Sequence, residues 1–176
     1  MNLSANFFEL FGFPEQFALD SKTLDQAYRV LQAQVHPDRF ADQGEAERRL
    51  SMQWATQVNE AYQRLKKPLA RASYLLHLRG VDLQTDSNTA MPMDFLMEQM
   101  EWREAVEEAQ QGGDHHELER LHHRLQGKLN ERYQQLATLL DLQKNDQGAA
   151  VEVRKLMCLD KLLFDINDAI ATLEDA

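Results

Sequence analysis

The chain has 176 residues, of which 43% are hydrophobic, and its formal net charge is −10. Its one cysteine excludes an internal disulfide and any paired-cysteine zinc or redox motif. No apolar run reaches the roughly 18 residues that a membrane-spanning helix needs. Glycine and proline are few, and runs of β-branched residues are almost absent, which predicts an all-α protein.

The charge is distributed unevenly along the chain. Residues 1–75 contain nine acidic and nine basic side chains, whereas residues 76–176 contain twenty acidic and ten basic ones. Neither half has a basic nucleic-acid footprint, so we expect no nucleic-acid partner. The first fifteen residues carry no positive charge, which argues against a secretory signal or a transit peptide and favours a cytoplasmic protein.

The N-terminal module is predicted to be a helical hairpin preceded by a short helix, Phe7 to Phe11. The second helix is capped by Asp20 or Ser21 and ends near Val35, and the third runs from about Glu45 to Leu65. Each long helix has one apolar face. The two faces consist of Leu24, Tyr28, Leu31 and Val35, and of Leu50, Trp54, Val58, Tyr62 and Leu65.

The tripeptide His36-Pro37-Asp38 lies between these two helices. Because proline disfavours the α conformation in the residue before it, the second helix should stop here and leave the tripeptide exposed at the tip of the hairpin. A partner contact is one interpretation. The other is a simple helix stop, since histidine suits a helix C-terminus and aspartate suits a turn.

The C-terminal half is predicted to be an antiparallel three-helix bundle. A helix from Leu69 to Leu78 and a polar connection come first. The bundle helices then run from about Met93 to Gln110, from Asp114 to Leu142 and from Ala149 to Leu173, with short connections between them. We therefore divide the chain into a module of residues 1–75, a connecting segment of residues 76–90 and a module of residues 91–176.

The helix from Met93 to Gln110 has two unlike apolar faces. At about 100° per residue, one face groups the residues expected in the core, which are Phe95, Trp102, Val106 and Ala109. The opposite face groups Leu96, Met97 and Met100 with Glu101, Glu104, Glu107 and Glu108. Four carboxylates cannot pack into a bundle, so these apolar side chains should be exposed within a charged rim, as in a binding surface.

Other chemically interesting residues favour a structural role. The pairs His115-His116 and His122-His123 are seven residues apart, and no two histidines have the i,i+4 spacing of zinc-binding helices, so we expect a solvated face and no metal. Cys158 lies within an apolar helix and is more typical of a core residue than of a nucleophile. No nucleotide-binding or nucleophile-elbow motif is present, which argues against catalysis.

The N-terminal module resembles a J domain, the co-chaperone hairpin that stimulates ATP hydrolysis by a seventy-kilodalton heat-shock chaperone. The likeness rests on His36-Pro37-Asp38 with its neighbours Tyr28-Arg29 and Arg39-Phe40, and on Asn59-Glu60-Ala61-Tyr62. Three further segments are similar to bacterial HscB co-chaperones and extend the resemblance over nearly the whole chain. They are residues 68–76, residues 95–99 and residues 153–162.

This resemblance implies a function in iron–sulfur cluster assembly. An HscB-like protein binds the IscU-type scaffold protein, delivers it to the HscA-type chaperone and stimulates the chaperone's ATPase, so it needs no cofactor and is not itself an enzyme. The implied chaperone-binding residues are His36, Pro37, Asp38, Lys22, Arg29 and Arg39. The implied scaffold-binding residues are Leu96, Met97, Met100, Glu101, Glu104 and Glu108, with Cys158 at a position that is aromatic in the family.

The chain departs from these relatives in three ways. Cys158 replaces an aromatic side chain; Gln26, Gln32 and Gln34 dilute the positive charge of the second helix; and the cysteine-bearing N-terminal extension of mitochondrial relatives is missing, which favours a bacterial protein. Two other functions remain open at this point. One is a general J-domain co-chaperone for unfolded clients, and the other is a helical enzyme whose metal is held by the histidines.

Overall fold

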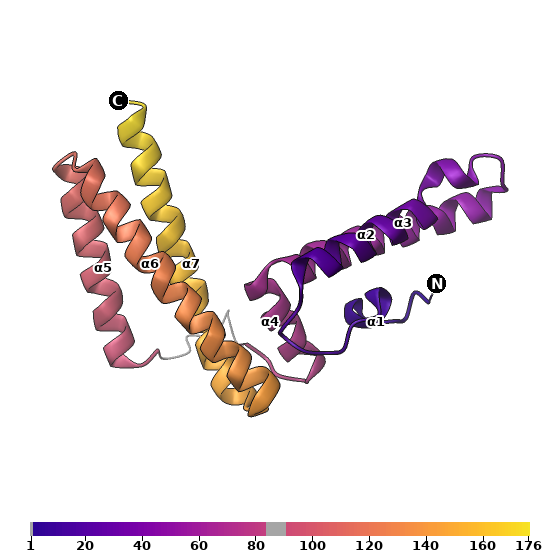
Figure 1. Ribbon diagram of the computed structural model, residues 1–176, viewed down its shortest axis with the longest axis horizontal. Coiled ribbons are helices and arrows are strands. Elements are labelled where there is room, and N and C mark those ends of the chain that lie inside the picture. Colours follow the sequence, from indigo (N-terminus) through magenta and orange to yellow (C-terminus); the bar gives the residue numbers. More distant parts are fainter. Residues whose placement is uncertain (1, 84–90) are drawn as a thin grey trace. The chain divides into compact units, whose positions relative to one another are not determined.

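The computed structural model describes residues 2–83 and 91–176, and within these ranges every regular element is a helix. The chain divides into two compact units, Met1–Arg79 and Gly80–Ala176 (Figure 1). The sequence-based boundary at residue 75 cuts through a helix, whereas the first unit includes that helix completely. Part of the predicted connecting segment, residues 84–90, lies outside the described residues.

The first unit is a hairpin of two long helices with two shorter helices packed at its base. The helices are α1 (Phe7–Phe11), α2 (Ser21–Val35), α3 (Glu45–Lys66) and α4 (Pro68–Leu78). Asp20 caps α2 by accepting a hydrogen bond from the backbone N–H of Lys22. A bond from the Thr23 hydroxyl, and after it this backbone bond, lower the pKa of Asp20. Its core contains Phe8, Leu24, Val58, Leu65, Leu75 and Leu76, all at most 1% exposed.

A stack of tyrosines joins α2 to α3. The rings of Tyr28 and Tyr62 lie 4.0 Å apart, and their hydroxyls donate hydrogen bonds to Asn59 and Asp25 respectively, each at 2.7 Å. Each tyrosine therefore contributes apolar contact through its ring and a satisfied polar group at its end. The residues that suggested a J domain on either side of the tip thus contact one another across the hairpin.

The prediction that Leu50 belongs to the buried face of the hairpin is wrong. Leu50 is exposed, and its neighbour Ser51 is fully buried instead. The Ser51 hydroxyl donates a hydrogen bond of 2.8 Å to the backbone carbonyl of Val35 at the end of α2. Because the buried side of α3 faces a helix terminus here, a small hydroxyl side chain that satisfies an orphan carbonyl occupies the position instead of an aliphatic one.

The second unit is a bundle of three helices, as predicted. They are α5 (Met93–Gln111), α6 (His115–Ala137), which continues in a π-helical turn (Thr138–Leu142), and α7 (Asp146–Glu174). Figure 1 shows the three helices side by side, connected by short turns. α7 begins three residues earlier than predicted because the Asn145 side chain caps it, accepting a hydrogen bond from the N–H of Gly148.

The core of this unit confirms the predicted core face of α5. Phe95, Trp102, Val106 and Ala109 are all buried, and they belong to the same core as a leucine row on α6 and an apolar face on α7. That row and that face consist of Leu118, Leu121, Leu125 and Leu129, and of Val153, Leu156, Leu159 and Leu162. Within the described residues no helix is long and apolar enough to cross a membrane.

A buried arginine connects three segments of the first unit. The guanidinium of Arg71 on α4 donates hydrogen bonds of 2.7 Å to the carbonyls of Phe17 and Leu65, and it stacks 4.9 Å from the Phe17 ring. The loop before α2 and the end of α3 are therefore held to α4 by a single side chain. Removing its donors would deprive the carbonyls of Phe17 and Leu65 of a charged hydrogen-bond donor.

We expect Arg71→Met to lower the free energy of unfolding by about 3 kcal/mol, since the thioether fills part of the volume but satisfies neither carbonyl. Urea denaturation followed by circular dichroism measures this change. The exposed Arg48 on α3 provides the control, because Arg48→Met should stay within about 0.5 kcal/mol of the unchanged protein. Equal losses in the two variants would contradict the structural role of Arg71.

Candidate partner-binding sites

The tip of the hairpin is a rigid, solvent-facing turn. α2 ends at Val35, His36 adopts an extended conformation with φ −58° and ψ 130°, and a 3-10 helix then begins at Pro37 and ends at Phe40. Proline enforces the extended conformation at His36 and fixes its own φ. The side chain of Asp38 is 93% accessible, compared with 53% for that of His36.

His36 and Asp38 face one another within the tip. The Nδ1 atom of His36 accepts a hydrogen bond of 3.2 Å from the backbone N–H of Asp38 and lies 3.6 Å from its carboxylate. These two contacts suit different protonation states, because Nδ1 must carry a lone pair for the first and a proton for the second. The backbone bond holds the imidazole against the turn.

Two side chains hold the tip to the helices beneath it. Arg39 donates a hydrogen bond of 3.4 Å to the carbonyl of Ala33 in the last turn of α2, and Ser51 anchors the carbonyl of Val35 from α3. A cation at a helix C-terminus also interacts favourably with the helix dipole. Arg39 is thus a part of the tip's structure as well as an exposed charge.

The predicted basic residues form a line that leads to the tip. Lys22 and Arg29 are seven residues apart, which places them on one edge of α2, roughly 10 Å apart along its axis, and His36 follows just beyond the end of the helix. Both basic side chains are exposed. Val30, next to Arg29, is 57% exposed, so the same region of α2 offers an apolar contact that the sequence analysis did not select.

The second site is the acidic–apolar face of α5, which we define as Leu96, Met97, Met100, Glu101, Glu104 and Glu108. All six side chains are exposed, as predicted; the accessible fractions of Leu96, Met97 and Met100 are 42%, 58% and 61%. Met93, one turn before Met97, is 72% exposed. Met93 lies four residues before Met97, a spacing that places both on one face of the helix. The sequence pattern could therefore have identified Met93 as part of this face.

The carboxylates of α5 are not equivalent. Glu98 points to the neighbouring helix and forms an ion pair with Lys128 of α6, whose pKa is lowered chiefly by burial. Glu101, Glu104 and Glu108 are exposed and surround the apolar residues. The exposed carboxylates therefore remain available to a partner, whereas Glu98 helps to hold α5 to α6.

Cys158 lies half-buried on α7. A thiol offers a partner much less contact area than an aromatic side chain would. Phe164 is exposed on the same helix, but six residues along a helix correspond to a rotation of about 120°, so its ring lies on a different face from Cys158.

The fold and the tip together define a class of protein: a J-domain co-chaperone with a C-terminal helical domain. Residues 91–167 match the family model described as the HSCB C-terminal oligomerisation domain. The chain is similar to co-chaperone HscB homologs of Aromatoleum aromaticum, at 52% identity over 99% of this chain and 98% of the relative, and of Burkholderia thailandensis, at 52% identity over 99% of both.

Solved structures show the same likeness. HscB of Vibrio cholerae is 37% identical, with a TM-score of 0.85 and coverage of 96% of this chain and 99% of that one. Human HscB is 26% identical, with a TM-score of 0.88 and coverage of 95% and 83%. The chain belongs to the HscB family of co-chaperones, which act in iron–sulfur cluster assembly, and it is a J-domain protein rather than an enzyme.

We expect Ser51→Ala to destabilise the first unit by about 1–3 kcal/mol, because the carbonyl of Val35 would then be buried without a donor. Thermal and chemical denaturation of the variant measure the loss. Ser73→Ala is the matched control, since the Ser73 hydroxyl only adds a second bond to a carbonyl within its own helix and its removal should cost little. A Ser51 variant as stable as the Ser73 variant would contradict this role.

Proposed function

We propose that the chain binds an IscU-type iron–sulfur scaffold protein through the acidic–apolar face of α5 and presents it to an HscA-type chaperone, whose ATPase the His36-Pro37-Asp38 tip stimulates. The observation that carries the proposal is the exposure of three large apolar side chains on a helix whose other side is buried in the bundle. A soluble helix exposes such a patch when a partner covers it.

The chemistry of this face defines its partner. Leu96, Met97 and Met100 offer flexible, polarisable contacts, and thioether side chains adapt to a partner's shape at low cost. The carboxylates around them favour a partner whose apolar patch is bordered by Lys or Arg, which assists orientation and association more than final affinity. A folded scaffold protein with such a patch fits this surface better than an unfolded client does.

The chemistry of the tip indicates how it acts on the chaperone. Asp38 is exposed and rigidly placed, so on docking it can compete for a cationic group or a hydrogen bond within the chaperone. Lys22, Arg29 and Arg39 supply positive charge beside it, but three cations give weaker electrostatic steering than a lysine-rich helix does. ATP hydrolysis takes place in the chaperone. Because this chaperone needs ATP, we propose that the protein works in the bacterial cytoplasm.

We expect Asp38→Asn to abolish stimulation of the HscA-type ATPase and to leave the fold intact, because the carboxylate is almost fully solvated. Single-turnover ATP hydrolysis with and without the scaffold measures the effect. Asp42→Asn, four residues further along the exposed turn, is the matched control and should stimulate normally. Full stimulation of the ATPase by the Asp38 variant would contradict the proposed role of the tip.

We expect replacement of Leu96, Met97 and Met100 by Ser to remove scaffold binding without loss of helicity. Central apolar contacts of an interface are each worth about 2 kcal/mol, so three losses should exceed a thousandfold in affinity. Isothermal titration calorimetry with the scaffold measures this. Leu142→Ser removes a still more exposed apolar side chain elsewhere in the same unit and should bind normally.

An unchanged affinity of the triple variant would show that the scaffold binds elsewhere. A pull-down separates the proposed function from the alternative of a general co-chaperone. Recovery of many unfolded clients, lost in the same triple variant, would favour that alternative. Recovery of one scaffold protein supports the proposal.

A further inference from the structure

The first turn of α6 brings two histidines and a glutamate together. Glu119 lies four residues after His115 and three after His116, so one carboxylate faces both imidazoles. Its oxygens lie 3.7 Å from Nδ1 of His115 and 3.6 Å from Nδ1 of His116, and the three ligand atoms all lie within 4.8 Å of one another. Spacings between pairs of histidines do not show this combination, because its third member is a carboxylate.

These separations are close to those of a metal site. In a tetrahedral zinc centre with bonds of about 2.0 Å, neighbouring ligand atoms are about 3.3 Å apart. The two glutamate–histidine separations exceed this value by a few tenths of an ångström, and the two imidazoles must approach one another by at most about 1.5 Å. Rotations within the three side chains can close these gaps, because all three are at least partly accessible. Two imidazoles and a carboxylate are also the ligand set that borderline first-row divalent cations prefer.

A carboxylate from another helix orients one of the imidazoles. The Nε2 atom of His115 lies 3.3 Å from Glu174 at the end of α7. An Nε2–H group that donates to Glu174 leaves the lone pair of His115 on Nδ1, which is the atom that faces Glu119. A carboxylate behind a ligating histidine recurs in zinc proteins, where it fixes the ring and increases its basicity.

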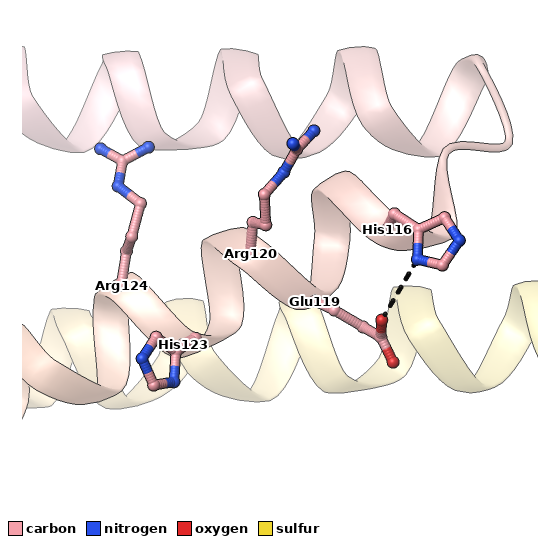
Figure 2. A pocket seen from close by; sticks show the side chains of 5 residues that line it. All are labelled: His116, Glu119, Arg120, His123 and Arg124. Atoms are coloured by element: carbon pink, nitrogen blue, oxygen red, sulfur yellow. Dashed lines mark ion pairs between the residues drawn. The ribbon is translucent and has the colours of Figure 1, made fainter.

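The surrounding charges permit a cation at this end of the helix. The dipole at a helix N-terminus disfavours a cation, but Asp114, Glu117, Glu119 and Glu174 all lie at or near the site. Arg120 is paired with Glu117. Figure 2 shows the side chains of His116 and Glu119 directed toward one another, with those of Arg120 and Arg124 pointing away from them.

We propose that His115, His116 and Glu119 bind one first-row divalent cation of the Zn²⁺ class, with water in the position left open. Through the His115–Glu174 contact the bound ion also stabilises the junction of α6 with the last turn of α7. The site lies on α6 and uses none of the residues assigned to the tip or to the acidic–apolar face. It therefore goes beyond the proposed function and does not depend on it.

The test is a titration of the full-length protein with Zn²⁺ alone. We expect about one ion per chain, reversed by a chelator, and a rise in melting temperature on binding. Glu119→Gln and His116→Ala should each weaken binding at least tenfold, since each removes a ligand, and Glu174→Gln should weaken it about tenfold by releasing His115. His122→Ala with His123→Ala, two turns further along α6, is the matched control and should bind as the unchanged protein does.

Three results would overturn the proposal. They are the absence of stoichiometric Zn²⁺ binding, binding that survives Glu119→Gln unchanged, and binding that is lost in the His122/His123 control or in Cys158→Ser. The last would assign the ion to other histidines or to the only thiol. Circular dichroism before each titration verifies that the variants keep the helical content of the unchanged protein.

Discussion

The break that Pro37 forces in the backbone is the constraint on which the first unit depends. A proline disfavours the α conformation at His36, so α2 ends at Val35 and the chain leaves the helix there. The last carbonyls of α2 then need new donors, and Ser51 and Arg39 provide them at Val35 and Ala33. The hydrogen bonds from Ser51 and Arg39 therefore stabilise the same backbone conformation that exposes Asp38.

The second unit is organised differently, because the single helix α5 contributes one face to the core and the opposite face to the exposed surface. Phe95, Trp102 and Val106 bury one side of α5, and their burial stabilises the helix by packing rather than by intrinsic propensity. With its backbone held in this way, α5 can expose Leu96, Met97 and Met100 on the other side without losing its helical structure. The apolar residues of the two faces differ in solvent exposure rather than in hydrophobic character.

Much of this organisation could be predicted from the sequence, since helix periodicity, proline and caps are local signals. The helix ends, the core face of α5 and the exposed residues opposite it follow from such signals. Leu50 was misplaced because its burial depends on what faces it, and here α3 faces the end of α2. Cooperation between His115 and Glu174, 59 residues apart, depends on how α6 and α7 pack, which periodicity within one helix does not report.

The two candidate sites differ in rigidity, and the difference suits what each has to do. The tip is fixed by a proline, a 3-10 turn and hydrogen bonds to both helices, so the proposed docking onto a chaperone costs little conformational entropy. The α5 face consists mainly of side chains with many rotamers, which adapt to a partner but lose entropy when they are ordered. A trigger needs one reproducible geometry, whereas a surface that must later release its partner gains from weaker, adaptable contacts. Placing the two sites on separate compact units lets each have the rigidity its task requires.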